Sequence, residues 1–124
     1  MKIIAPSMLS CNFGKLEKEI EMVNQSEAGW FHLDVMDGVF VPNITFGTPI
    51  LEVFKKYATK HLDAHLMIVN PENYIEKFAS LGANTITVHY EACDNLVDTI
   101  NQIKKLNVKA GVAINPDTDV SVLY

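Results

Sequence analysis

The sequence has few cysteines and no long apolar run. Cys11 and Cys93 lack the close spacing of a zinc-binding knuckle or a redox pair, so we interpret them as free thiols in a reducing compartment. No stretch approaches the roughly 20 consecutive apolar residues that a membrane-spanning helix needs. Because the first residues, MKIIAPSMLSCNF, contain no secretory cleavage pattern, we expect a cytoplasmic protein with no membrane partner.

Basic residues are also scarce. The chain has 10 Lys and Arg against 15 Asp and Glu, a formal net charge of −5. A nucleic-acid-binding surface needs an excess of Lys and Arg on one face, so this balance argues against a nucleic-acid partner. It does not exclude an anionic small molecule, because a local site can oppose the global charge. With 48% apolar and 20% charged residues in 124 positions, the chain has the composition of one folded domain.

The chain alternates between β-rich segments and segments with helical spacing of apolar residues. We expect five strands, at residues 2–9, 29–36, 60–68, 84–90 and 108–115. We expect four helices, at residues 14–28, 50–58, 70–83 and 94–107, and the start of a fifth after residue 115. Strands that alternate with helices, without hairpin signals, predict an α/β protein with a parallel sheet and right-handed crossovers.

Four residues are expected to delimit these helices. Gly29 is interpreted as the stop of the first helix. Asn70 is a candidate N-cap of the third helix, with Pro71 in its first turn and Gly82 just past its end.

Polar and soft side chains gather where the expected strands end. They are Ser7, then His32, Asp34 and Met36, then His65 and Met67, then His89, and finally Asn115. In a parallel α/β sheet the carboxyl ends of the strands form the edge at which ligands bind. We therefore expect a ligand site at this edge.

Two histidines and one aspartate in this group have the character of a metal site. The two-residue period of a strand puts His32, Asp34 and Met36 on one face, and likewise His65 and Met67. If these strands are neighbours, His32, Asp34 and His65 converge as a transition-metal ligand set with open positions. The alternative is a hydrogen-bonded polar core. The two methionines are either flexible core filler or an apolar wall beside a reactive group.

Other polar residues nearby receive more ordinary interpretations. Ser7 either contacts a substrate hydroxyl or caps the following turn, for which Asn12 competes. Asp37 precedes a glycine and is interpreted as a turn residue. We assign His89 a structural role, because no partner is evident, and we assign Asp63 no role.

Five stretches resemble the ribulose-phosphate 3-epimerase family: APSMLSCNF, FHLDVMDGVFVPNITFG, LDAHLMIVNPENYI, GANTITVHYEA and KAGVAINPDT. Related decarboxylases carry a lysine where this chain has Met36, which argues against decarboxylation. The resemblance implies a (β/α)8 TIM barrel, which needs eight strands and typically about 250 residues. Residues 1–124 would then be the N-terminal portion of a single barrel domain, with about five strands and four to five helices.

The resemblance also implies an activity and roles for particular residues. Family members interconvert D-ribulose 5-phosphate and D-xylulose 5-phosphate, in the pentose phosphate pathway, by removing the C3 proton to form an enediolate. Asp34 matches the base. Three residues match the ligands of one divalent ion (Fe²⁺, Zn²⁺, Mn²⁺ or Co²⁺), and four match substrate contacts. The ligands are His32, Asp34 and His65, and the substrate contacts are Ser7, His65, Met36 and Met67.

Two parts of the family's machinery have no counterpart in these residues. The second aspartate, which serves the opposite face of C3, and the phosphate-holding loops lie on later strands of the family's barrel. We therefore expect the isolated chain to be an incomplete enzyme that either associates, as a homo-oligomer through unpaired strand edges or by aggregation, or folds poorly. Two alternatives stay open: a related epimerase for allulose 6-phosphate, and a non-catalytic half-barrel that binds metal or oligomerises.

Overall fold

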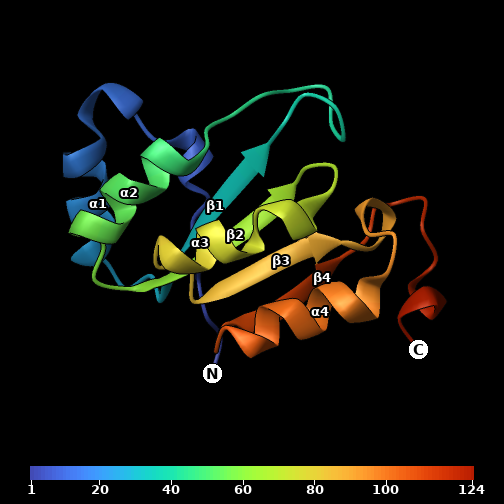
Figure 1. Ribbon diagram of the computed structural model, residues 1–124. Coiled ribbons are helices and arrows are strands. Elements are labelled where there is room, and N and C mark those ends of the chain that lie inside the picture. Colours follow the sequence, from blue (N-terminus) through green and yellow to red (C-terminus); the bar gives the residue numbers. More distant parts are fainter.

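The structure, a computed structural model of residues 1–124, contains one parallel sheet in the order β1-β2-β3-β4. Helices join consecutive strands, which confirms the expected βαβ repeat (Figure 1). The strands are β1 (Trp30–Met36), β2 (His61–Met67), β3 (Thr85–His89) and β4 (Lys109–Ala113). The helices are α1 (Leu16–Asn24), α2 (Thr48–Tyr57), α3 (Ile75–Ser80) and α4 (Leu96–Lys105). This α/β arrangement is that of a partial TIM barrel.

The first of the five expected strands is absent as a regular strand. The segment before residue 7 runs beside β1, where the carbonyl of Ile4 accepts from Gly29 N–H at 2.9 Å and that of Pro6 accepts from His32 N–H at 3.0 Å. Proline has no N–H to return such a bond, and one isolated parallel bridge, between Ser7 and His32, is the only β pairing. The segment is therefore an extended edge that still brings Ser7 beside β1.

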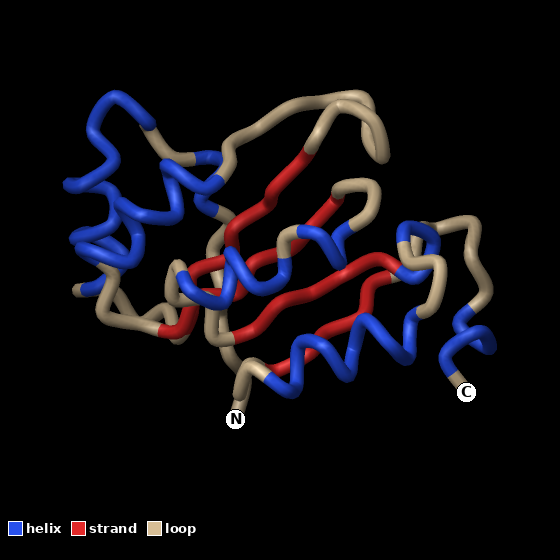
Figure 2. Tube along the Cα trace, in the orientation of Figure 1, coloured by secondary structure: helices blue, strands red, loops and turns tan.

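The hydrophobic core lies between the sheet and the helices. Alternate residues of β1 (Phe31, Leu33 and Val35) are buried there, and the Phe31 ring packs edge-on against Phe54 of α2 with centroids 5.7 Å apart. The tube view follows the same strands and helices along the chain (Figure 2). Because one set of strand residues fills the core, the alternate set, which includes His32 and Asp34, is left on the opposite face of the sheet.

Several expected helix boundaries are wrong. Asn70 adopts a left-handed conformation (φ 49°) and its side chain caps nothing, whereas an N-cap needs an extended backbone. The chain instead makes a 3₁₀ turn over Pro71–Asn73 before α3 begins. Gly29 does not stop α1, which ends at Asn24, but Gly82 follows α3 with φ 93°, as expected of a helix-terminating glycine.

Short 3₁₀ turns complete the chain. The expected fifth helix is only such a turn, Val120–Leu123, capped by the Asp119 side chain. The others are Met8–Ser10, Phe13–Lys15 and Tyr90–Ala92. None of the helices is both long enough and apolar enough to cross a bilayer.

Gly111 on β4 is required for close packing against β3. A Cβ at this position would overlap Thr87 Oγ1 and lie 3.1 Å from Thr87 Cβ. We expect Gly111→Ala to lower the free energy of unfolding by about 1–3 kcal/mol, the usual cost of overpacking. Gly47→Ala is the matched control, because a Cβ there would meet nothing within 4 Å. Urea unfolding of both variants measures the difference, and equal stability would contradict the packing role.

Candidate functional site

The loop after β1 is tied back onto the strand by two side chains. Thr45 Oγ1 donates to the carbonyl of Asp34 at 2.7 Å and accepts from Met36 N–H at 3.0 Å. Asp37 is a turn residue, as expected: its Oδ1 accepts from the N–H groups of the next turn and its Oδ2 accepts from Val69 N–H at 2.8 Å. Thr45 was not among the residues expected at this site, because its role depends on where the loop returns.

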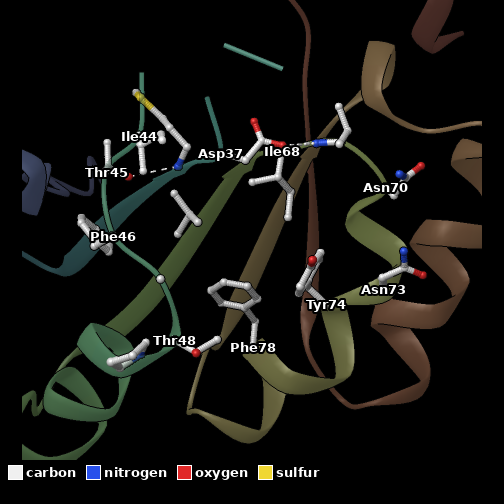
Figure 3. A pocket seen from close by; sticks show the side chains of 15 residues that line it. Asp37, Ile44, Thr45, Phe46, Thr48, Ile68, Asn70, Asn73, Tyr74 and Phe78 are labelled. Carbon is white, nitrogen blue, oxygen red and sulfur yellow. Dashed lines mark hydrogen bonds between the residues drawn. The ribbon is translucent and has the colours of Figure 1, made fainter. Parts of the chain in front are cut away.

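A cavity of about 620 Å³ opens between this loop and the start of α3 (Figure 3). Its lining includes none of His32, Asp34 and His65, and its apolar side chains include Met36, Phe46, Ile68 and Phe78. Val35 and Ile68, which also line it, are part of the core-facing set, so the cavity opens on the helix side of the sheet. It is distinct from the polar cluster on the other face.

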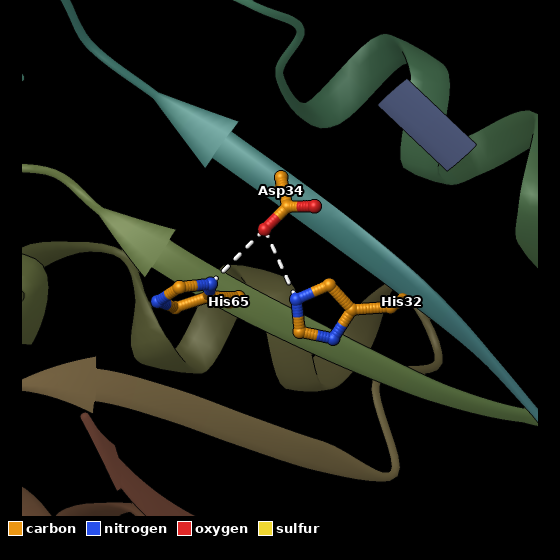
Figure 4. Close-up of side chains that lie close together, drawn as sticks. All are labelled: His32, Asp34 and His65. Atoms are coloured by element: carbon orange, nitrogen blue, oxygen red, sulfur yellow. Dashed lines mark hydrogen bonds and ion pairs between the residues drawn. The ribbon is translucent and has the colours of Figure 1, made fainter. Parts of the chain in front are cut away.

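The polar cluster is built by the register of β1 and β2. Asp34 pairs with His65, and Met36 with Met67. His32 Nε2 and His65 Nδ1 each lie 3.0 Å from Asp34 Oδ1 (Figure 4). The expected convergence of these three residues is therefore confirmed in position. Met36 and Met67 follow two residues later on their strands, where Met67 is buried and Met36 is half-buried.

The donor set fits a divalent transition metal. One ligand atom from each of His32, Asp34 and His65 lies within 4.8 Å of the other two, and all three residues are only partly buried. Two imidazoles and a carboxylate are a familiar ligand combination for such ions, and three protein ligands leave coordination positions open for a substrate.

Ser7 caps the first 3₁₀ turn, as one of its two expected descriptions has it, and it also contacts Asp34. Its hydroxyl donates to Asp34 Oδ2, the oxygen that the two histidines leave free, and it accepts from Leu9 N–H at 3.4 Å to cap the first 3₁₀ turn. Asn12 caps the following turn instead, through Gly14 N–H at 3.0 Å. Both oxygens of Asp34 are therefore engaged within the cluster.

Asp63 has a role that the sequence did not predict. Its Oδ2 lies 2.9 Å from His32 Nδ1, and its Oδ1 accepts from the Thr87 hydroxyl at 3.1 Å. A carboxylate behind a histidine orients the ring and selects the nitrogen that faces a metal. The available signal was the two-residue spacing of Asp63 and His65, which puts both side chains on one face of the strand.

His89 is also part of the cluster, which corrects its assignment as a structural residue without a partner. Its Nε2 lies 2.8 Å from His65 Nε2, and the two rings stack with centroids 5.0 Å apart. The histidines of β1, β2 and β3 therefore form a continuous row across the sheet.

Hydrogen bonding sets the charges at the centre of the cluster. The hydrogen bonds of His32 to Asp34 and Asp63 raise its pKa to about 10 against the opposing effect of burial. Burial raises the pKa of Asp34, but the hydrogen bonds from His32, His65 and Ser7 outweigh it and hold that pKa well below its ordinary value. In the metal-free protein a proton therefore occupies His32, and this proton must leave before its Nε2 can bind an ion.

Comparison with known proteins shows which family this chain is similar to. The model of the ribulose-phosphate 3 epimerase family matches residues 3–124. Three relatives illustrate the similarity. The ribulose-phosphate 3-epimerase of Synechocystis sp. is 48% identical over 123 residues, which cover 98% of this chain and 54% of the relative. The ribulose-phosphate 3-epimerase of Bacillus subtilis is 49% identical over 120 residues, which cover 97% of this chain and 55% of the relative.

The third relative, the chloroplastic ribulose-5-phosphate-3-epimerase of Arabidopsis thaliana, is 44% identical over 123 residues, which cover 98% of this chain and 44% of the relative. The chain thus spans about half the length of the curated relatives it matches. Since the family model covers nearly the whole sequence, the chain belongs to the ribulose-phosphate 3 epimerase family.

Proposed function

We propose that this chain supplies the metal ligands and one of the two proton-transferring faces of an enzyme that interconverts D-ribulose 5-phosphate and D-xylulose 5-phosphate. The observation that carries the proposal is the position of Asp34, whose carboxylate contacts His32, His65 and Ser7 at the carboxyl ends of the strands. The names of the relatives support the reaction, and we propose for this chain a place in the pentose phosphate pathway and in the cytoplasm.

His32, Asp34 and His65 are proposed to hold one divalent ion, Fe²⁺, Zn²⁺, Mn²⁺ or Co²⁺. When bound, the ion acts as a Lewis acid that stabilises the negative charge developing on the substrate's carbonyl and hydroxyl oxygens. Asp63 supports the site by keeping the Nδ1 hydrogen of His32 turned away from it.

Asp34 is proposed to be the base that removes the C3 proton. Its Oδ1 faces the two imidazoles, so Oδ2, which carries the Ser7 hydrogen bond, is the oxygen available for proton transfer. The lowered pKa keeps the carboxylate ionised, which is the form that accepts a proton. The C3 proton is acidic because C2 is a carbonyl, and a positioned Asp carboxylate is one of the side chains that act as general bases.

The remaining contacts are proposed to position the substrate. Ser7 would hydrogen-bond a substrate oxygen, and His65 would contact the substrate from its place beside Asp34. Met36 and Met67, the pair at the strand ends, would cover the reacting carbons with an apolar surface that donates no proton.

A chimaera tests the proposal. Residues 1–124 would be joined to the C-terminal portion of the Bacillus subtilis relative, and conversion of ribulose 5-phosphate and allulose 6-phosphate would be compared with that of this chain alone. We expect the chimaera to prefer ribulose 5-phosphate and the isolated chain to show negligible turnover, because inversion needs a second proton-transferring group on the opposite face of C3. Preference for allulose 6-phosphate would favour the alternative of an epimerase for that six-carbon substrate. A chimaera that is well folded but inactive would favour the alternative of a non-catalytic half-barrel.

We also propose that the isolated chain forms homo-oligomers. β4 pairs with β3 alone, and the N-terminal segment beside β1 exposes Ile3 and Ile4. Unpaired strand edges favour association with another chain. Sedimentation velocity at several protein concentrations is expected to show concentration-dependent species larger than 13.8 kDa, whereas a single monomeric species would contradict this expectation.

A further inference from the structure

His89 contains the only buried side-chain nitrogen or oxygen atom without a hydrogen-bond partner. That atom is Nδ1, which lies 3.6 Å from Glu91 Oε2, too far for a hydrogen bond. The other ring nitrogen, Nε2, is 2.8 Å from His65 Nε2. A buried polar atom without a partner is costly unless another state of the protein satisfies it.

The contact between the two Nε2 atoms couples the hydrogen positions on both rings. Two ring nitrogens at this distance need one hydrogen between them, so one donates and the other accepts. An ionised Asp34 can only accept, so His65 Nδ1 is the donor in its 3.0 Å contact with Asp34 Oδ1. A neutral His65 then accepts at Nε2, His89 donates from its own Nε2, and His89 Nδ1 carries no hydrogen. This arrangement explains why His89 Nδ1 has no hydrogen-bond partner.

The opposite arrangement is needed when His65 offers its Nδ1 lone pair to a metal ion. His65 then carries its hydrogen on Nε2 and donates it to His89 Nε2. In this exchange the Nδ1 hydrogen of His65 is released to solvent, the Nε2 hydrogen of His89 passes to His65 Nε2, and one solvent proton is taken up at His89 Nδ1. His89 must carry its own hydrogen on Nδ1, which points towards Glu91 Oε2. The rings need no large movement for this exchange: the two Nε2 atoms keep their 2.8 Å contact, and only the 3.6 Å gap between His89 Nδ1 and Glu91 Oε2 must shorten to hydrogen-bond distance.

Glu91 is held in place to receive that hydrogen. Its Oε1 accepts from the backbone N–H of Asn115 and from the Thr118 hydroxyl, the latter at 2.8 Å, so its Oε2 stays directed towards His89. The other side of the His89 ring is covered by Phe40, whose ring centroid is 5.0 Å away. His89 is thus held by His65 at Nε2 and by the Phe40 ring, and Glu91 Oε2 lies 3.6 Å from its Nδ1.

We propose that His89 is a positioning residue for the metal centre: it accepts a hydrogen bond from His65 Nε2 and so keeps the His65 lone pair at Nδ1, while Glu91 accepts the hydrogen of His89 Nδ1. Metal uptake therefore reverses the tautomer of His89 from Nε2–H to Nδ1–H, although His89 does not touch the ion. This inference rests on the proposed metal site at His32, Asp34 and His65.

NMR of the ¹⁵N-histidine-labelled chain with and without Zn²⁺ tests the tautomers directly. Long-range ¹H–¹⁵N correlations distinguish the protonated from the bare nitrogen of each ring. We expect His89 to be Nε2–H in the metal-free protein and Nδ1–H with Zn²⁺ bound. His61, which stacks on Trp30 and hydrogen-bonds Thr85 at the other end of β2, is the internal control and should not change.

Two substitutions of His89 separate its acceptor role from packing. His89→Leu removes the acceptor, and loss of such an outer hydrogen bond typically weakens metal binding about 10–100-fold. His89→Gln retains an acceptor oxygen near the position of Nε2, so we expect Zn²⁺ affinity within about threefold of the original chain. His61→Leu and His61→Gln are the matched controls and should leave affinity unchanged. Thermal unfolding of the metal-free variants verifies that each is folded.

The outcomes separate this inference from the metal site itself. Zn²⁺ uptake with His89 remaining Nε2–H would overturn the inference and leave the metal site standing. Equal loss of affinity in the Gln and Leu variants would overturn it as well, because packing would then explain both. An original chain that takes up no Zn²⁺ would overturn the metal site and the inference together.

Discussion

Replacing Asp34 with asparagine is expected to lower turnover of ribulose 5-phosphate by about 10²- to 10⁴-fold in the chimaera. Asparagine has nearly the same shape but cannot accept the C3 proton, and a positioned acid–base group is worth about this much in rate. Loss of the negative charge that faces His32 and His65 would add to the effect. The measurement is steady-state turnover together with exchange of the C3 hydrogen with solvent deuterium.

Two comparisons make the result specific to proton transfer. Asp98→Asn, the same change on α4 away from the site, should leave turnover unaltered. Zn²⁺ uptake by Asp34→Asn reveals how much of the loss comes from the metal, because the amide oxygen is still able to coordinate. Turnover within about tenfold of the original chimaera would overturn Asp34 as the base.

Replacing both His32 and His65 with alanine is expected to abolish stoichiometric metal uptake by the 124-residue chain. Asp34 would be the only ligand left, and removing even a residue behind a ligand typically costs about 10–100-fold in affinity. Metal analysis of chelator-stripped protein after incubation with Zn²⁺ should therefore fall from about one ion per chain to background. Thermal unfolding should give the same result. Because an ion that binds only the folded state stabilises it, Zn²⁺ should raise the unfolding temperature of the original chain and leave that of the double variant unchanged.

His61→Ala is the control for the double variant. His61 lies on the same strand as His65, but its Nε2 contacts Thr85 Oγ1 at 2.7 Å and its ring stacks on Trp30 at 3.9 Å. Uptake by this control should equal that of the original chain. If the double variant still binds one ion, the assigned ligands are wrong.

The sequence by itself determined the arrangement of the sheet and the place of the site. The apolar residues of β1 recur at every second position and fill the core, so the period of the strand alone assigns His32 and Asp34 to the opposite face. Helices between strands require a parallel sheet, and a parallel sheet brings the strand ends to one edge. The two-residue period of a strand and the alternation of strands with helices are both visible within the sequence, so the sequence alone was sufficient to predict these features.

Only the tertiary structure decided the contacts around the metal ligands. The register of β1 against β2 puts Asp63 behind His32, and the pairing of β2 with β3 brings His89 against His65. The backward path of the loop brings Thr45 to the end of β1. Each of these contacts joins residues from different segments, and it depends on side-chain direction and strand offset, which no pattern within a single segment contains.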